Sequence, residues 1–267
     1  MSENRTLVMG ILNITPDSFA DGGRHNTFEL ALKRAHEMIA EGVDIIDVGG
    51  ESTRPGAERV SPDEEINRII PIITELKDLG VPTSVDTMRA STAQAAINAG
   101  VSYVNDVSGG LADADMTKLI ARSSEVQYIA MHWRGHSAKM QDAAIYKDVV
   151  KEVKDELEER SEALIKAGID AERLILDPGL GFAKTAEHNW ELLRNLDRLS
   201  FLGFPLLIGA SRKSFLGKLL NDALPDDRES ASVAITTELA RQGIWGVRTH
   251  SVKPHRDAIE VVGELGK

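Results

Sequence analysis

Short apolar runs alternate with longer amphipathic stretches along the whole chain. A short apolar run is typical of a strand buried on both faces of a parallel sheet, and apolar residues three or four apart are typical of a helix covering such a sheet. The predicted strands are Leu7–Leu12, Val43–Ile46, Val81–Val85, Val101–Val104, Val126–Met131, Leu174–Leu176, Pro205–Ile208 and Ile244–Val247. The predicted helices are Phe28–Ala40, Pro62–Leu79, Ser91–Ala99, Met116–Arg122, Tyr146–Ala167 and Glu229–Arg241. This repeat indicates an α/β protein with a parallel sheet.

Residues at the ends of the predicted helices fit these boundaries. Ser61, followed by Pro62 and then by acidic residues, is typical of a helix start, and Thr27 precedes the first predicted helix. Glycine follows several of the helices and can adopt the left-handed conformation that ends them. These glycines are Gly42, Gly80, Gly100, Gly168 and Gly243.

The strand–helix repeat predicts a (β/α)8 TIM barrel, whose active site lies at the carboxyl ends of the strands. A length of 267 residues is normal for such a barrel, and no linker interrupts the repeat, so we expect one domain over residues 1–267. An open, doubly wound sheet is the alternative. Neither the glycine-rich dinucleotide fingerprint nor a Walker sequence occurs to support it.

Composition excludes several classes of site and partner. The chain has no cysteine, which rules out disulfides, thiolate metal sites and a cysteine nucleophile. Its net charge of −11 argues against nucleic acid and anionic membranes as partners, so an anionic substrate would need a local group of basic residues. The first residues lack the features of a signal peptide, and no apolar run is long enough to cross a bilayer. We therefore expect a cytoplasmic protein.

Polar residues follow the apolar runs at nearly every predicted strand end. They are Asn13, Asp47, Asp86, Asn105, His132, Asp177, Lys213, Arg248 and His250. In a barrel these positions converge on one mouth. Together they are more polar than a structural core tolerates, which indicates a binding site.

Three of these residues also have a purely structural interpretation. Asp177 precedes Pro178, Gly179 and Gly181, and its carboxylate can either cap that turn or bind a ligand. Asp47 can brace the glycine turn after the second strand. For His132 we favour a hydrogen-bonded core histidine, because buried histidines usually have structural partners.

The chemistry of the strand-end residues divides into two groups. The acids and amides suit a heterocycle with several N–H donors, because a carboxylate can accept two parallel hydrogen bonds. Arg248 and His250, two apart on one strand, suit an oxyanion such as phosphate. Ser211 to Ser214 are expected to begin a helix whose free N–H groups favour an anion. Lys213 can form a Schiff base, but its position in a turn favours a hydrogen-bonding role.

Two predicted loops are rich in glycine, proline, serine and aspartate. They span residues 13–23 after the first strand and 49–57 after the second. Each is either an ordinary surface loop or a lid that closes over substrate.

Motifs in a fixed order cover nearly the whole chain. They lie at residues 9–23, 47–56, 84–87, 104–107, 131–135, 176–182, 211–214 and 247–250. Together they resemble the dihydropteroate synthase family, the folate-pathway enzymes inhibited by sulfonamides. The resemblance implies condensation of 7,8-dihydropterin-6-ylmethyl diphosphate with 4-aminobenzoate to 7,8-dihydropteroate and diphosphate, by an SN1-type substitution. It also implies a Mg²⁺ cofactor near Asn13 and a homodimer.

The resemblance also implies roles for individual residues. Those matching the pterin site are Asp86, Asn105, Asp177 and Lys213, and Asp47 joins them as a substrate-binding candidate on its position alone. Those matching the diphosphate site are Asn13, Arg248 and His250. Those matching the aminobenzoate site are Thr53, Arg54, Pro55, Phe182, Ser211 and Lys213. Asp21, which matches a residue that stabilises the pterin cation, completes a catalytic set with Lys213, Arg248 and His250.

One position departs from the family pattern. An acidic residue usually follows the strand-eight histidine, and here Ser251 stands there. This departure is the one feature that favours a catalytically silent pterin-binding homologue. A methyltetrahydrofolate-dependent methyltransferase barrel is a second alternative, against which Ser211 to Ser214 and the loop at Thr53 argue. No insertion that would exclude sulfonamides occurs in the second loop or after Pro178, so we expect sensitivity to them.

Overall fold

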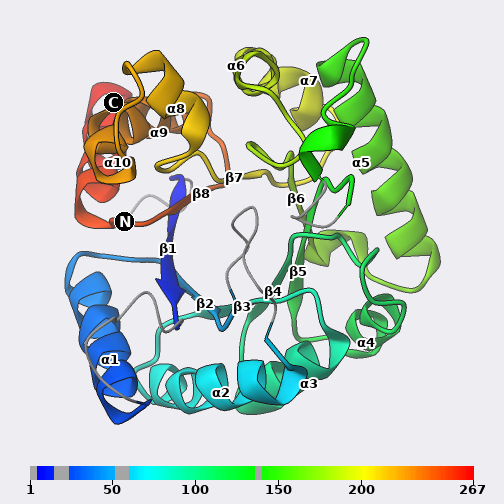
Figure 1. Ribbon diagram of the computed structural model, residues 1–267, viewed down its shortest axis with the longest axis vertical. Helices are drawn as coiled ribbons and strands as arrows, with labels where there is room; N and C mark the ends of the chain where they lie inside the picture. The colour runs from blue at the N-terminus through cyan, green and yellow to red at the C-terminus, as the bar shows by residue number, and fades with distance from the viewer. Residues whose placement is uncertain (1–4, 15–23, 52–59, 136–139) are drawn as a thin grey trace.

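The strands of the computed structural model, which describes residues 5–14, 24–51, 60–135 and 140–267, stand at the centre of a ring of helices (Figure 1). The strands in these ranges are β1 Leu7–Asn13, β2 Ile45–Gly49, β3 Thr83–Asp86, β4 Tyr103–Asp106, β5 Gln127–Met131, β6 Leu174–Asp177, β7 Leu207–Ile208 and β8 Gly246–Thr249. They pair in the order β6-β5-β4-β3-β2-β1-β8-β7, and every ladder is parallel.

The two outer strands of this order, β6 and β7, also meet. Leu176 pairs with Leu206 in a parallel bridge, and the Leu176 N–H donates to the Pro205 carbonyl at 2.9 Å. The sheet is therefore a nearly closed eight-stranded barrel. The prediction of a (β/α)8 fold is confirmed, and the open doubly wound alternative is wrong.

Helices surround the barrel. The α-helices are α1 Arg24–Ala40, α2 Pro62–Asp78, α3 Ala90–Ala99, α4 Met116–Arg122, α5 Val149–Lys166, α6 Ala186–Arg194, α7 Leu196–Ser200, α8 Ser214–Leu219, α9 Glu229–Arg241 and α10 Lys253–Leu265. Short 3-10 helices are η2 Met140–Ala143, η3 Ala171–Arg173 and η4 Pro225–Arg228. The predicted set lacked α6, α7 and α10. Helix α7 is too short to show a period, but Pro254 near the start of α10 and the buried Ile259 were readable signals.

Most predicted helix ends are confirmed. The Ser61 hydroxyl accepts a hydrogen bond from the Glu64 N–H at 3.2 Å, which caps α2. The glycines predicted to follow helices all have positive φ, between +70° and +104°. Thr27 was a wrong choice of start, because α1 begins three residues earlier, at Arg24.

The strands extend further than their apolar runs. Asn13, Asp47, Asp86, Asn105, Asp177 and Arg248 lie within the strands, whereas the predicted strands stopped before them. Backbone pairing in a parallel ladder does not require apolar side chains, so a strand can continue through a polar residue that faces the barrel mouth.

The barrel interior contains an apolar layer directly below the polar residues. Met9, Ile45, Ile129, Ile175 and Leu207 form it, and they are packed against Leu7, Tyr103 and Trp245. Asp47, Asn105 and Asp177 each lie two positions beyond an interior residue of the same strand, so they face the same interior. The fold thus places a set of polar side chains on a dry apolar floor.

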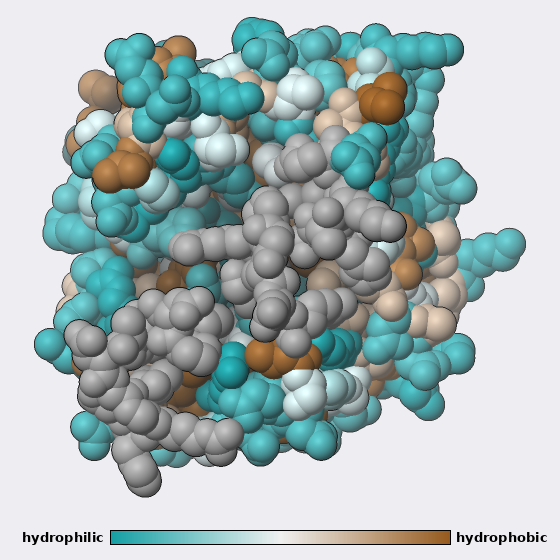
Figure 2. Space-filling model, viewed as in Figure 1, coloured by the Kyte–Doolittle hydropathy of each residue, from teal (hydrophilic) through white to brown (hydrophobic). Residues whose placement is uncertain are grey.

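The outer surface of the helices is largely hydrophilic, as the rim of Figure 2 shows. Among the described segments, none of the helices combines the length and the apolar character that crossing a bilayer requires.

Candidate functional site

Arg248 is the centre of the polar cluster at the barrel mouth. Its Nε donates to Oδ2 of Asp47 at 2.6 Å, and its Nη2 donates to Oδ2 of Asp86 at 2.7 Å. Asn105 donates from Nδ2 to the same Asp47 oxygen at 3.0 Å. Four strands, β2, β3, β4 and β8, therefore contribute to one connected group. Asp47 interacts across the barrel and does not merely brace its own turn.

The second oxygens of both carboxylates are buried without a partner. Oδ1 of Asp47 and Oδ1 of Asp86 have no hydrogen bond to any described residue. A buried carboxylate oxygen without a donor is costly, so such atoms indicate a place for water or for a ligand N–H group.

Asp106, next to Asn105, provides a contrast. Its carboxylate accepts hydrogen bonds from the N–H groups of Ser108 and Gly110 and from the hydroxyls of Ser108 and Tyr128, at 2.6–2.8 Å. All of these donors come from the protein itself, so Asp106 shapes the β4 loop. The unpaired oxygens therefore mark Asp47 and Asp86 as different from a structural aspartate.

The charges at the mouth depend on one another. Burial raises the pKa of Asp86 to about 7; the positive charge of Arg248 opposes this rise, and the negative charge of Asp47 adds to it. Burial alone would lower the pKa of Arg248, but the charges of Asp47 and Asp86 outweigh burial and raise it. The guanidinium thus stays charged and holds two neighbouring carboxylates together.

The position of Asp177 is compatible with both of the roles that the sequence left open. Its Oδ1 accepts a hydrogen bond from the Gly179 N–H at 2.7 Å, so the carboxylate does cap its own turn. Its Oδ2 would lie 4.0 Å from a Cβ placed on Gly209, so the lack of a side chain at Gly209 leaves space beside this oxygen. Burial raises the pKa of Asp177, against the nearby charges of Lys213 and Arg248.

Lys213 reaches the site across the turn that follows β6. Its Nζ donates to the Leu180 carbonyl and lies 4.2 Å from the centre of the Phe182 ring. Gly181, at φ +79°, leaves room for this side chain, since a Cβ there would meet Lys213 Cδ at 2.9 Å. Burial lowers the pKa of Lys213 to about 8. Lys213 and Phe182, both predicted site residues, are therefore in direct contact.

His250 and Ser211 also lie together. The Ser211 hydroxyl is 3.1 Å from Nδ1 of His250 and accepts the His250 backbone N–H at 3.2 Å. The expected helix start differs, because α8 begins at Ser214. The N–H groups of Arg212 and Lys213 already donate to Ser232 and Ala210, at 3.0 and 3.3 Å. They are not the free helix N–H groups that the sequence suggested.

A carboxylate stands beside Ser251 even though residue 251 is not acidic. The Ser251 hydroxyl donates to Oε1 of Glu229 on α9. The other Glu229 oxygen accepts from Nε of Arg212 at 3.1 Å, and His255 Nε2 lies 3.1 Å from Oε1. Glu229 was missed as a site-supporting residue, because only the fold brings it beside a residue 22 positions away.

His132 has partners on both ring nitrogens. Nε2 lies 2.9 Å from Oε2 of Glu156, and Nδ1 lies 3.0 Å from Nζ of Lys184. This arrangement fits the core-histidine interpretation. Lys184 itself was missed, although a lysine seven residues after Asp177 in an apolar segment was a visible signal. It is only 4% exposed.

Asn13 ends β1 at the rim of the same site. Its Oδ1 would lie 3.2 Å from a Cβ placed on Gly49, and Oδ2 of Asp86 would lie 3.8 Å from the same point. An amide oxygen and a carboxylate oxygen thus flank Gly49. No group of three or more acidic or histidine side chains suited to a metal occurs in the ranges that the structure describes.

The predicted site residues Asp21, Thr53, Arg54 and Pro55 lie outside the described residues. Arg89 contacts described residues on both sides of the second loop. It donates from Nη1 to Glu51 at 2.5 Å and from Nη2 to the Val60 carbonyl at 2.7 Å, and it also pairs with the buried Glu65. Arg89 therefore joins residues 51 and 60 to the start of α3.

Comparison with known proteins identifies relatives of the whole chain. A family model described as pterin binding enzyme matches residues 9–250. A dihydropteroate synthase of Mycobacterium leprae is 48% identical over 262 residues, covering 96% of this chain and 92% of the relative.

Solved structures agree with the sequence comparison. A Xanthomonas albilineans dihydropteroate synthase with 4-aminobenzoic acid has a TM-score of 0.92 at 42% identity and covers 98% of this chain and 94% of its own. The same organism's enzyme in complex with 7,8-dihydropteroate has a TM-score of 0.89 at 38% identity, with coverage of 100% and 95%. A Yersinia pestis enzyme in a sulfonamide drug complex has a TM-score of 0.92 at 38% identity, with coverage of 100% and 96%.

Proposed function

Because the chain belongs to the pterin-binding enzymes and, among them, to the dihydropteroate synthases, we propose that its barrel mouth holds three adjoining subsites. The activity is the family's transfer of a dihydropterin-methyl group to the amine of 4-aminobenzoate in folate biosynthesis. One observation carries the assignment of residues: carboxylates with unpaired buried oxygens lie across the mouth from basic side chains.

The pterin subsite comprises Asp47, Asp86, Asn105, Asp177 and Lys213. A pterin ring presents several N–H donors and ring acceptors, which suit carboxylate and amide partners. The unpaired oxygens of Asp47 and Asp86 support this role, because a ligand donor there would remove the cost of burying them. The apolar layer beneath them would support the face of a ring.

The diphosphate subsite comprises Asn13, Arg248 and His250. Arg248 uses Nε and Nη2 for the two carboxylates, and no described residue accepts from its Nη1. That group is therefore available to a phosphate oxygen. His250, beside Ser211, would add a second donor near the departing charge.

Mg²⁺ fits this subsite, and we propose Asn13 as its protein ligand. Mg²⁺ is commonly bound through one or two protein oxygens plus substrate phosphates. The Asn13 amide oxygen meets that description, and the oxygens flanking Gly49 are of the right chemical type. When bound, the ion would neutralise part of the diphosphate charge and so improve it as a leaving group.

The aminobenzoate subsite comprises Phe182, Ser211 and Lys213, together with Thr53, Arg54 and Pro55 of the second loop. The contact of Lys213 with the Phe182 ring supports it, since an apolar ring face next to a cation suits an aromatic carboxylate. Arg89, which joins residues 51 and 60, would keep the ends of that loop near the mouth.

The chemistry is proposed to be an SN1-type substitution. Arg248 and His250 would stabilise the departing diphosphate, and Asp21 would stabilise the pterin cation until the aryl amine attacks. The carboxylates hold the ring in place and need no proton-transfer role. Loops that exclude water would protect the cation from hydrolysis.

Three wider features are proposed on the same basis. Residues 1–267 would form one domain that works in the cytoplasm. Two copies would pair, and exposed apolar side chains on α8, on α10 and just before η4 are available for such contact. They include Leu219, Leu224, Val261 and Leu265. Sulfonamide inhibition is also proposed, because the Yersinia pestis relative binds such a drug.

The residue assignment is tested by measuring, for each variant, the KM for the dihydropterin diphosphate and the KM for 4-aminobenzoate. Asn105→Ala should raise the KM for the dihydropterin diphosphate, and Phe182→Ala should raise the KM for 4-aminobenzoate, each with little effect on the other substrate. Equal effects on both substrates would refute the division into subsites. Wild-type protein that binds pterins but makes no dihydropteroate would instead support the silent-homologue alternative.

A further inference from the structure

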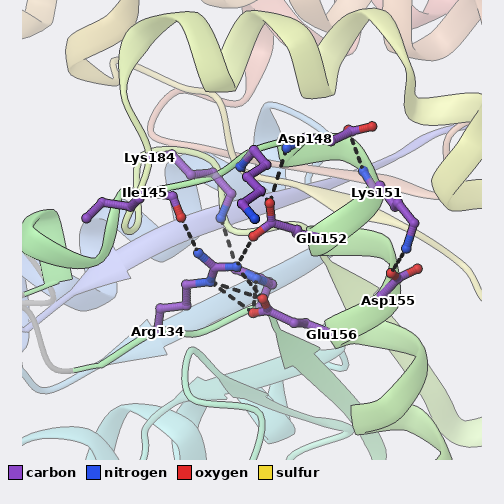
Figure 3. A network of polar contacts seen from close by, with 10 residues as sticks. Arg134, Ile145, Asp148, Lys151, Glu152, Asp155, Glu156 and Lys184 are labelled. Carbon is purple, nitrogen blue, oxygen red and sulfur yellow. Dashed lines mark hydrogen bonds and ion pairs between the residues drawn. The ribbon is translucent and has the colours of Figure 1, made fainter.

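Lys184 is a buried lysine that forms no ion pair with a carboxylate of the described residues. Its Nζ contacts Nδ1 of His132 at 3.0 Å and the Phe182 carbonyl at 3.1 Å. On the other side of the His132 ring, Nε2 lies 2.9 Å from Oε2 of Glu156. Figure 3 shows Glu156 and Glu152 of α5 gathered around Arg134, with Lys184 above them. A buried lysine and a carboxylate are thus joined through a histidine ring.

The hydrogen bonds in this row determine the histidine tautomer. The Glu156 carboxylate can only accept, because its pKa is lowered to about 2, so Nε2 of His132 must carry the proton donated to it and Nδ1 is left to accept from Lys184. Burial and the positive charge of Lys184 lower the pKa of His132 to about 4, so the ring is neutral. A neutral imidazole bridging two opposite charges is oriented by both of them.

The charges around the row come from several elements. Lys184 faces Asp177 of β6, Lys213 before α8, Arg134 after β5 and Glu156 of α5; burial is the largest influence and lowers its pKa to about 7. Glu156 is also bound by Arg134, which pairs with Glu152 as well. Arg134 therefore holds Glu156, the anionic end of the row, in place.

The loop that Lys184 holds is conformationally strained. Ala183 is a buried non-glycine residue at φ +49°, in the left-handed region that alanine rarely adopts. Such a residue keeps this conformation only where its surroundings impose it. The contacts of the next residue, Lys184, with His132 and the Phe182 carbonyl provide that constraint.

We propose that Lys184 is a positioning residue for the aminobenzoate subsite, acting through the bridge Lys184–His132–Glu156. By holding the Phe182 carbonyl and the strained Ala183, it sets the place of the Phe182 ring, against which Lys213 packs. The same turn offers the Leu180 carbonyl to Lys213. This inference rests on the proposed role of Phe182 and Lys213 in binding 4-aminobenzoate.

The first test compares two lysine-to-methionine variants of the whole protein. Lys184→Met should raise the KM for 4-aminobenzoate about tenfold and change the KM for the dihydropterin diphosphate less than about twofold. Lys151→Met, at an exposed lysine of α5 paired with Asp155, is the matched control and should change neither. A residue that only stabilised the fold would lower thermal stability without this selectivity, and that result would overturn the proposal.

A second measurement does not depend on activity. Nitrogen NMR of the imidazoles, with His132 assigned by its loss in His132→Asn, should show the Nε2–H tautomer in the wild type. In Lys184→Met the titration of His132 should move to higher pH, because the neighbouring cation is gone. A wild-type Nδ1–H tautomer would refute the bridge even where Lys184→Met is poorly folded, and a titration unchanged in folded Lys184→Met would refute it as well.

The two proposals fail separately. Wild-type protein that makes no dihydropteroate would refute a working synthase site and leave the NMR test of the bridge intact. Active wild-type protein together with an unchanged aminobenzoate KM in Lys184→Met would refute the positioning role alone.

Discussion

Arg248 on β8 donates from Nη2 to Oδ2 of Asp86 on β3, 2.7 Å away across the barrel mouth. These residues are 162 positions apart in the chain, and the same guanidinium also binds Asp47. Removing one partner of a buried ion pair leaves the other charge uncompensated, which costs more than the pair itself contributes. Arg248 should therefore matter for stability as well as for substrate binding.

Arg248→Met should lower the free energy of unfolding by about 3–5 kcal/mol at pH 8. The loss should shrink toward pH 5, because without the guanidinium the pKa of Asp86 rises further. A carboxyl with a raised native pKa binds more protons in the native state, so its contribution to stability falls as pH rises above about 4. Urea unfolding at both pH values measures this.

The control for this experiment is Arg198→Met, at an exposed arginine of α7. It should change stability by less than about 0.5 kcal/mol at either pH. An equal loss for Arg248→Met at pH 5 and pH 8 would show that its partners are not charged carboxylates.

Asp177→Asn should weaken pterin binding by about 2 kcal/mol, because a charged acceptor is replaced by a neutral one. The amide oxygen can still accept the Gly179 N–H, so the turn and the stability of the fold should be nearly unchanged. Calorimetric titration with a pterin gives the affinity, and Asp197→Asn on the surface of α7 is the matched control. Unchanged pterin affinity would remove Asp177 from the pocket.

Ser251→Asp tests whether Glu229 already supplies the negative charge that the family pattern places at residue 251. The substitution loses the hydroxyl donor to Glu229 and places two carboxylates side by side. We expect the free energy of unfolding to fall by about 2 kcal/mol at pH 8, with no decrease in the KM for the dihydropterin diphosphate. A lower KM would mean that Ser251 does weaken diphosphate binding.

The stability of the wild type relative to Lys184→Met should depend on pH in the alkaline range. The native pKa of Lys184 is about 7, against an ordinary value of 10.5, so the unfolded state binds more protons between these limits. The stability difference should therefore rise with pH from about 7 to 10, by at most about 1.4 kcal/mol per pH unit. Urea unfolding of both proteins across this range measures the difference in their free energies of unfolding. A difference that does not change with pH would show that Lys184 titrates at its ordinary pKa.

The barrel and its polar mouth could be predicted from the sequence because both follow from local patterns. Apolar runs predict the strands, and the period of two predicts which residue shares a face with the interior layer. Asp177 illustrates the limit of such reasoning. A turn after a strand predicts a capping carboxylate, which Oδ1 confirms, and a strand end predicts a ligand-facing one, which stays a prediction for Oδ2.

Contacts between distant parts of the chain could not be predicted. The pairing of Arg248 with Asp47 joins residues 201 positions apart, and Lys184 meets His132 across 52 positions. Sequence spacing carries no information about such pairs. Arg248 and Asp47 meet because β8 and β2 both pair with β1, and Lys184 and His132 meet because β5 pairs with β6. Glu229 beside Ser251 is a similar case, because the sequence alone did not show that a carboxylate lies next to this position.

Diphosphate release from the dihydropterin diphosphate by the purified protein, followed with and without 4-aminobenzoate and Mg²⁺, is the most direct test. We predict dihydropteroate and diphosphate in equal amounts when all components are present, loss of both products on chelation of Mg²⁺, and restoration when it is returned. No dihydropteroate at high enzyme concentration would contradict the assignment of this barrel mouth as a working synthase site.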